Sequence, residues 1–207
     1  MSDREVWPCF TSITVGSICY NLMPKNLSFW YLWSVAMINS GLDLWYTFPS
    51  YMLEEENGEE IKVNDYLKAA IEEAKKGMEE GGIPIGSVIV HKGRIIGRGH
   101  NKRAQKGSAI LHGEMDALEN AGRQPASVYK ECTLYTTLSP CSMCSGAILL
   151  YSIPHVVIGE NKTFMGEEDL LRSRGVKVDV LQDKTCISLM REFIEKNPKL
   201  WNEDIGV

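Results

Sequence analysis

The chain reads Leu111-His112-Gly113-Glu114 at one point and Ser139-Pro140-Cys141-Ser142-Met143-Cys144 at another. Together these two segments supply an imidazole, two thiols and a carboxylate. Zinc binds imidazole nitrogen and thiolate sulfur in tetrahedral geometry, and a catalytic zinc keeps one of its four positions open for water. His112, Cys141 and Cys144 would fill three positions, which leaves Glu114 free for another task.

The spacing of the two cysteines favours a helix N-terminus at the metal. Cys141 and Cys144 stand at i and i+3, on one side of a first helical turn, and Pro140 is well suited to the start of that helix. The positive end of a helix lowers the pKa of nearby thiols, so both cysteines can bind as thiolates. Water held by such a metal has a pKa of roughly 7, and Glu114 can then move protons between water and substrate.

A closed structural zinc site and a redox pair are the alternatives for the two cysteines. A structural site needs a fourth ligand, and the candidates are Cys132, Cys186, His91, His100 and His155. None of these has a second ligand-type residue at metal spacing, and a closed site would give Glu114 no task. The sequence therefore predicts a catalytic zinc. His100 and His155 are interpreted as structural residues.

Composition bounds the class of protein. A chain of 207 residues can bury a sizeable core, and its net charge of −5 gives no general attraction to a phosphate backbone, so we expect no nucleic-acid partner. Four further cysteines, Cys9, Cys19, Cys132 and Cys186, have no regular framework spacing. This favours a reducing compartment, and we expect a cytoplasmic protein that can also occur in the nucleus.

The composition changes sharply near Met52, which predicts three parts: an aromatic-rich extension over 1–53, an acidic linker over 54–63 and an enzyme domain over 64–207. The extension has five charged residues and four of the five tryptophans. Its apolar run over 29–38 is too short to cross a bilayer, so no stable membrane span is expected. A poorly ordered extension and upstream sequence absent from the mature protein, with Met52 as the start, are favoured over a membrane-surface or partner-binding segment.

Periodicity and turn residues predict an alternation of helices and strands across the domain. Helices are expected over 65–80, 112–121, 142–151, 167–174 and 184–196, the first of them capped by Asn64 and ended by Gly81-Gly82. Strands are expected over 85–91, 94–100, 132–138, 155–159 and 176–181. This order predicts a mixed five-stranded sheet between two layers of helices, a three-layer α/β/α sandwich.

From about Asp65 to Val207 the chain resembles the fungal, yeast-type cytosine deaminases of the zinc-dependent cytidine/deoxycytidylate deaminase superfamily. Besides the two metal segments, the resemblance rests on Gly81-Gly82-Ile83-Pro84-Ile85-Gly86, Gly97-Arg98-Gly99-His100-Asn101, Leu134-Tyr135-Thr136-Thr137-Leu138 and Trp201-Asn202-Glu203-Asp204-Ile205-Gly206. It implies a homodimer with one zinc per subunit that converts free cytosine to uracil and ammonia in pyrimidine salvage, in a pocket beneath the C-terminal segment. Two departures stand out: the family usually has an aromatic residue where Asn202 stands, and it lacks the first fifty-odd residues.

The resemblance also implies a set of substrate-binding residues: Asn101, Gly113, Leu138, Ser139, Phe164, Trp201 and Asp204. Asn101 would bind the O2 and N1 edge of the pyrimidine, and Asp204 would accept from its exocyclic amino group. Main-chain groups of Gly113 and near Leu138 and Ser139 would contact the base, and the two aromatic residues would close over the ring. The ordinary alternatives are a turn position for Asn101, a solvated Asp204 and core positions for the aromatic residues.

Two other function classes remain open at this point. A deaminase of the same fold acting on a nucleoside or a tRNA base would need a wider or basic channel, and the cluster of Lys102, Arg103 and Lys106 is interpreted instead as a solvated loop. A non-catalytic zinc-binding module could use the aromatic extension, but Glu114 argues against it. The apolar run over 147–150 suits either the core or a dimer interface.

Overall fold

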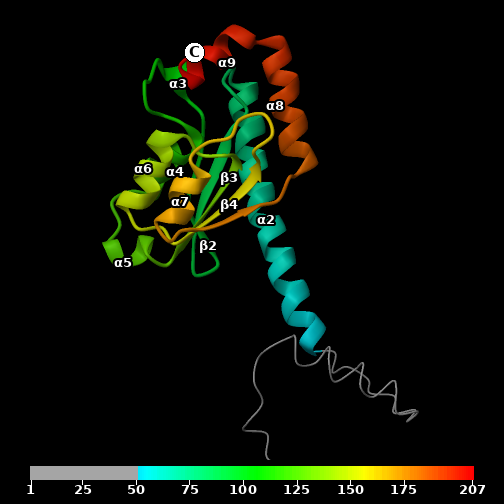
Figure 1. Ribbon diagram of the computed structural model, residues 1–207, viewed down its shortest axis with the longest axis vertical. Coiled ribbons are helices and arrows are strands. Elements are labelled where there is room, and N and C mark those ends of the chain that lie inside the picture. Colours follow the sequence, from blue (N-terminus) through cyan, green and yellow to red (C-terminus); the bar gives the residue numbers. More distant parts are fainter. Residues whose placement is uncertain (1–50) are drawn as a thin grey trace, which may run out of the picture. The chain divides into compact units, whose positions relative to one another are not determined.

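The computed structural model describes the backbone of residues 51–207 and the side chains of residues 65–207. Its elements are, in chain order, α2 (Tyr51–Glu79), β1 (Gly86–His91), β2 (Arg94–His100), α3 (Arg103–Lys106), α4 (Gly113–Ala121), α5 (Ala126–Tyr129), β3 (Cys132–Leu138), α6 (Ser142–Leu150), β4 (His155–Glu160), α7 (Glu168–Ser173), β5 (Lys177–Val180), α8 (Lys184–Lys196) and α9 (Pro198–Ile205) (Figure 1). The extension predicted over residues 1–53 lies, up to residue 50, outside the described residues.

The sheet is mixed, with the strand order β2-β1-β3-β4-β5. β1 runs antiparallel to both β2 and β3, whereas β3, β4 and β5 are parallel. The β1–β2 hairpin turns at Lys92 and Gly93, whose φ angles of 47° and 77° match the left-handed pair that twisted hairpins prefer. Because Gly86 pairs with His100, the carboxyl ends of β2 and β3 lie at the same edge of the sheet as the start of β1.

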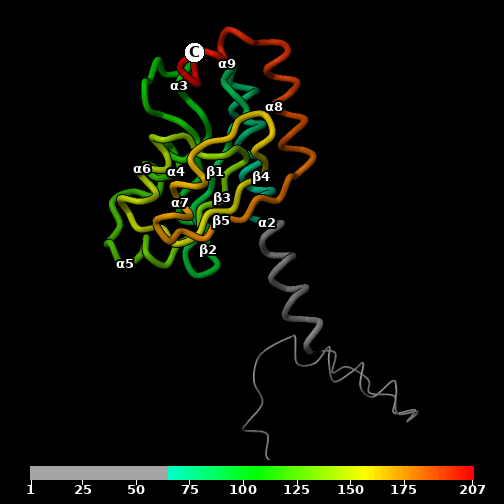
Figure 2. Tube along the Cα trace, viewed as in Figure 1, coloured from blue at the N-terminus to red at the C-terminus, as the bar shows by residue number. Residues whose placement is uncertain are grey.

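Helices cover both faces of the sheet, as the sequence predicted (Figures 1 and 2). Successive side chains of a strand point to opposite faces of the sheet, so alternate residues pack against different helix layers. Ile89 and Leu134 pack in one cluster with residues of α4, α6 and α7, while Val88 and Tyr135 pack in another with residues of α2. A third cluster joins α2 to Cys186 of α8. The three-layer α/β/α sandwich is therefore confirmed.

Helix α4 lies unusually close to β2 because two strand residues have no side chain. A Cβ atom on Gly97 would stand 2.3 Å from the carbonyl oxygen of Ala117, and one on Gly99 would stand 2.2 Å from the Ala117 nitrogen. No side chain fits such gaps without moving the helix. The close approach fixes the position of α4, whose first residues belong to the segment that carries His112 and Glu114.

Two features differ from the sequence prediction. Helix α2 begins at Tyr51, so residues 54–63, predicted as a linker, are helical and Asn64 is not a cap. The reason is that this stretch contains no proline and is rich in glutamate, a good helix former, which outweighs the cost of Gly58. The short helices α3 and α5 and the C-terminal helix α9 were not predicted.

Among the described residues, no helix combines the length and the apolar character that crossing a bilayer requires. The apolar run predicted not to span, residues 29–38, lies outside the described part of the chain.

Substitution Gly99→Ala is expected to destabilise the protein by about 1–3 kcal/mol, because the added methyl group overpacks the contact with α4. Urea unfolding measures the effect. Gly146→Ala in α6 is the matched control, since its Cβ would meet nothing within 4 Å, and it should be neutral or slightly stabilising. Equal midpoints for the two variants would contradict the close packing.

Candidate metal and active site

A cavity of about 300 Å³ opens at the sheet edge where β2, β3 and β4 end. We call it the edge cavity. Its lining includes Ile85, Arg103, His112, Glu114, Leu138, Ser139, Cys141, Phe164, Trp201 and Asp204. Residues from widely separated parts of the chain therefore meet at one point, as expected for a binding site in an open α/β sheet.

His112, Cys141 and Cys144 present their ligand atoms to one another, all within 4.8 Å. The Nδ1 atom of His112 lies 3.4 Å from the sulfur of Cys141 and 3.7 Å from that of Cys144. Tetrahedral zinc with Zn–S of about 2.3 Å and Zn–N of about 2.0–2.1 Å requires about 3.6 Å between nitrogen and sulfur. The donor set therefore fits zinc in type and in spacing, with Nδ1 as the imidazole atom facing the metal.

Two helix N-termini meet at this cluster, as the sequence predicted. His112 is the N-cap residue of α4 and Cys141 that of α6, both with extended backbone. The hydrogen bond from Cys144, opposed by burial and assisted by His112, lowers the pKa of Cys141 to about 4. The same hydrogen bond, together with burial, raises the pKa of Cys144. The lowered pKa predicted for both thiols is therefore found for Cys141 only.

Glu114 lies beside the cluster and is buried, with burial as the leading cause of its raised pKa. Thr136 donates to its Oε1 atom at 3.1 Å, and Ser87 donates to Thr136 at 2.9 Å. The Oε2 atom lies 3.4 Å from the Cys144 sulfur. The carboxylate is therefore held by one oxygen and faces the ligand cluster with the other, an arrangement suited to proton transfer.

Asn101, Arg103 and Asp204 form a closed hydrogen-bonded group next to the cluster, with Oδ1 of Asp204 3.8 Å from Nε2 of His112. The Asn101 carboxamide donates to Asp204 at 3.0 Å and accepts from the Arg103 backbone at 3.0 Å. Nη1 of Arg103 donates to both the carboxylate and the carbonyl oxygen of Asp204, each at 2.8 Å. The Asp204 side chain is only 4% exposed. The alternative interpretation of Asp204 as a solvated surface acid is therefore wrong.

Arg103 is a residue whose place the sequence analysis missed, because it was grouped with Lys102 and Lys106 as a solvated loop. It lines the edge cavity, and its cation lies at the C-terminal end of α9, where a positive charge is favoured. The only signal in the sequence was its position two residues after Asn101.

Phe164 and Trp201 meet edge to face over the cavity, with ring centroids 6.0 Å apart. Two buried acids that the sequence analysis did not name hold the surrounding loop. Glu168 accepts from Ser139 Oγ at 2.9 Å, and Glu160 accepts from the backbone of Lys162 and Thr163. Glu160 is the last residue of β4 and Glu168 the first residue of α7. Their roles come from burial and these hydrogen bonds, and no local sequence motif marks them.

The remaining predicted residues lie close to the cavity but outside its lining. Gly113 is the first residue of α4 and lies close to Ile85. Asn101 is connected to the cavity wall by its hydrogen bond to Asp204. Asn202 is exposed on α9 and does not line the cavity, so its departure from the family pattern leaves the wall unchanged.

Comparisons with known proteins agree with this geometry. Residues 61–160 match the model of the cytidine and deoxycytidylate deaminase zinc-binding region. The chain is 60% identical to the cytosine deaminase of Candida albicans over 141 residues, covering 68% of this chain and 94% of that protein. It is 45% identical to the tRNA-specific adenosine deaminase of Bacillus subtilis over 95 residues, covering 45% of this chain and 59% of that protein.

The fold also matches a solved structure, the diaminohydroxyphosphoribosylaminopyrimidine deaminase/5-amino-6-(5-phosphoribosylamino)uracil reductase of Thermotoga maritima. The TM-score is 0.54 at 28% identity, covering 66% of this chain and 42% of that one. The likeness therefore extends over less than half of that protein.

Removing either thiol of the cluster, by Cys141→Ala or Cys144→Ala, is expected to lower zinc content and thermal stability together, because each change takes one ligand from a three-ligand site. Metal analysis after dialysis and thermal unfolding measure the two effects. Cys186→Ala, at a buried cysteine outside the cluster, should lose some stability but keep its zinc. Full zinc occupancy in either cluster variant would exclude that residue as a ligand.

Proposed function

This chain belongs to the cytidine and deoxycytidylate deaminase family, and from that membership we propose that it hydrolyses free cytosine to uracil and ammonia. The observation that carries the proposal is the 60% identity to a cytosine deaminase along 94% of that protein's length. The edge cavity supports it, because a metal cluster, a buried carboxylate and a carboxamide–carboxylate pair line or adjoin one small space.

His112, Cys141 and Cys144 would hold one zinc ion per subunit. The donor types and their spacing fit zinc. When bound, zinc supplies Lewis-acid chemistry, which lowers the pKa of water from about 15.7 to about 7.

Glu114 would carry the protons of the reaction. Hydrolysis adds the oxygen of water to C4 of cytosine and expels the exocyclic nitrogen as ammonia, so protons must move from water to ring N3 and to the leaving nitrogen. Glu114 is the buried carboxylate of the cavity wall that lies against the Cys144 sulfur, and its raised pKa suits a group that both accepts and returns a proton. Thr136 holds one of its oxygens, which restricts the rotation of the carboxylate.

The substrate contacts would come from polar side chains, main-chain groups and two aromatic rings around the cavity. Asn101 keeps one free N–H and one free lone pair after its bonds to Asp204 and Arg103, enough for the O2 and N1 edge of the base. Asp204 would accept from the exocyclic amino group, and main-chain groups of Gly113, Leu138 and Ser139 would contact the ring. Phe164 and Trp201 would cover it.

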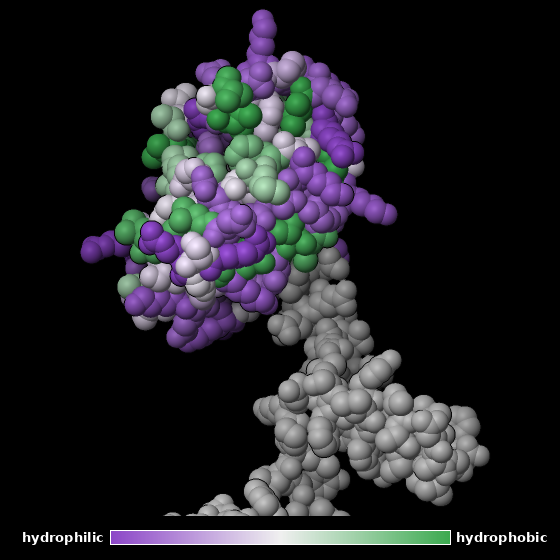
Figure 3. Space-filling model, in the orientation of Figure 1, coloured by the Kyte–Doolittle hydropathy of each residue, from purple (hydrophilic) through white to green (hydrophobic). Residues whose placement is uncertain are grey.

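We further propose that the enzyme is a homodimer. Leu150, at the end of α6, is 75% exposed, and Tyr151 beside it is also exposed, which leaves apolar area for a second copy. Figure 3 shows apolar residues scattered among hydrophilic ones on the face in view.

The location that we propose is the cytoplasm and also the nucleus. The cysteines of the described residues are free thiols, which supports such a reducing compartment.

A tRNA base or a nucleoside is the second candidate substrate. It is favoured only by the likeness to tRNA-specific adenosine deaminases, which covers about half of the chain. Incubating the zinc-loaded protein with cytosine, cytidine, adenine, guanine and a tRNA, and measuring product for each, separates the candidates. Turnover of cytosine alone is expected, and turnover of the tRNA alone would overturn the proposal.

Substitution Glu114→Gln is expected to keep zinc and fold but to lower kcat about 10²- to 10⁴-fold, because the variant cannot transfer protons. Steady-state kinetics at matched zinc content measure the loss. Glu119→Gln, at an exposed position of the same helix, is the control and should turn over cytosine normally. Near-normal activity of Glu114→Gln would remove Glu114 from the mechanism.

Deleting residues 201–207 is expected to lower kcat/KM for cytosine by at least about 100-fold while zinc stays bound, because the cover and the Asp204 contact are lost together. Asp204→Ala removes only the polar contact and should cost roughly 10- to 100-fold. Lys199→Ala, exposed on the same helix, is the control for both. Equal kcat/KM for the truncated and intact proteins would show that α9 neither closes the site nor binds substrate.

A further inference from the structure

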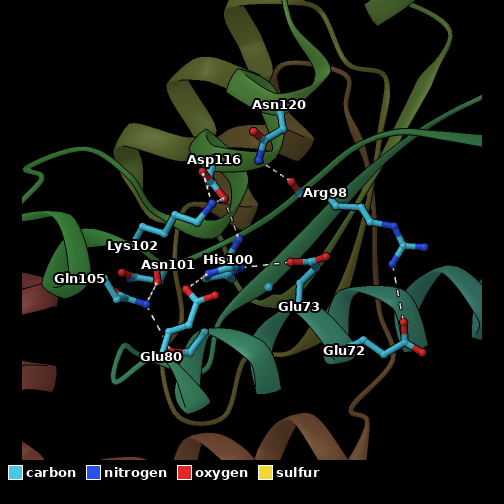
Figure 4. Close-up of polar contacts among 12 residues, drawn as sticks. Glu72, Glu73, Glu80, Arg98, His100, Asn101, Lys102, Gln105, Asp116 and Asn120 are labelled. Atoms are coloured by element: carbon cyan, nitrogen blue, oxygen red, sulfur yellow. Dashed lines mark hydrogen bonds and ion pairs between the residues drawn. The ribbon is translucent and has the colours of Figure 1, made fainter.

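His100, the last residue of β2, is a buried histidine to which the proposed reaction assigns no task. Its side chain is 1% exposed. Its Nδ1 atom lies 3.1 Å from Glu73 Oε2, and its Nε2 atom lies 2.9 Å from Glu80 Oε2. Figure 4 shows the ring between these two carboxylates of the α2 region, with Asn101 next to it.

Both ring nitrogens are paired, and each contact comes from a different carboxylate. The hydrogen bond with His100 is the leading cause of the lowered pKa of Glu80. The buried ring is therefore held at two points.

Helix α2 and the turn after it are shaped to receive this ring. Glu73 and Glu80 stand seven residues apart, two helical turns, so they project from the same side of the chain. Between them lies Gly77, where an added Cβ would stand 2.9 Å from Cδ2 of His100. The ring therefore lies directly against the helix backbone with one carboxylate at each nitrogen.

Hydrogen bonds hold the backbone of His100 and Asn101 in place. Asp116, itself paired with Lys102, accepts from the His100 N–H at 3.1 Å. The N–H of Asn101 donates to the Ile85 carbonyl at 2.9 Å. The Asn101 carbonyl accepts from Gln105 Nε2 at 3.0 Å, and the same nitrogen lies 3.3 Å from the Gly77 carbonyl.

From this arrangement we infer that His100 is a positioning residue for cytosine binding: held between Glu73 and Glu80, its ring fixes the backbone of Asn101 and so the direction of the carboxamide. This inference rests on the proposed function. The link is the peptide unit itself, because a shift of the buried ring moves Cα of His100 and, through the planar peptide, the next residue. The carboxamide would then lose its alignment with Asp204, 3.0 Å away.

A double-mutant cycle tests whether His100 acts through Asn101. His100→Ala is expected to lower kcat/KM for cytosine about tenfold or more, mainly through KM, at unchanged zinc content. In an Asn101→Ala background the same change should alter kcat/KM less than about twofold, since neighbouring residues that act as a unit are not additive. For variants too slow to assay, cytosine binding by calorimetry, with Glu114→Gln added to every member, gives the same cycle.

His155→Ala is the matched control. This histidine also pairs with a carboxylate, Asp179 at 2.8 Å, but it begins β4 at the opposite end of the sheet. It should keep kcat/KM within about twofold of the wild type, and it should lose less stability than His100→Ala in thermal unfolding because its side chain is 23% exposed.

A second variant covers the case in which His100→Ala does not fold. The Glu80 side chain is 43% exposed, so Glu80→Ala should fold, and it should raise KM in the same direction but less. Equal losses in the two backgrounds, for either variant, or no loss at all, would overturn the positioning role. Failure of the wild type to deaminate cytosine would instead overturn the proposed function, so the two outcomes are distinct.

Discussion

The meeting of two helix N-termini at one sheet edge is the constraint on which the rest of the structure depends. His112 and Cys141 are both N-cap residues, and the strands that precede them, β2 and β3, end at the same edge of the sheet. Their side chains can share a metal only because β1 lies between β2 and β3 and because glycines in β2 let α4 approach the sheet. The positive ends of two helices then face the ligand cluster, which favours negative charge there.

The buried acids at and near the site differ in whether a cation lies beside them. Asp116, Asp204 and Glu168 each have a cation within 3.2 Å. Glu114 has hydroxyl and thiol partners instead, at 3.1 Å and 3.4 Å. Burial is the main cause of the raised pKa of Glu114, because burial disfavours the ionised form of a carboxyl group.

Much of the fold could be predicted from the sequence, because the signals were local. Strands 94–100 and 132–138 and helix 184–196 were predicted with the observed bounds, from residue alternation and an apolar stripe. Helix α9 was missed because it is short and follows the break at Asn197-Pro198. Arg103, Glu160 and Glu168 were missed for another reason: each acquires its role only through contacts with residues far along the chain or through burial, which no local pattern reveals.

The hairpin turn at Lys92 and Gly93 has a practical consequence for engineering. Since Gly86 pairs with His100 at the cavity edge, the turn lies at the other end of the sheet. The strands that flank it pair antiparallel from Gly86–His100 to His91–Arg94, with one register shift between Ile89 and Val90. A fluorescent reporter or an immobilisation tag inserted there would therefore leave the substrate entrance open, and the loop offers an attachment point that keeps the cavity directed away from a solid support.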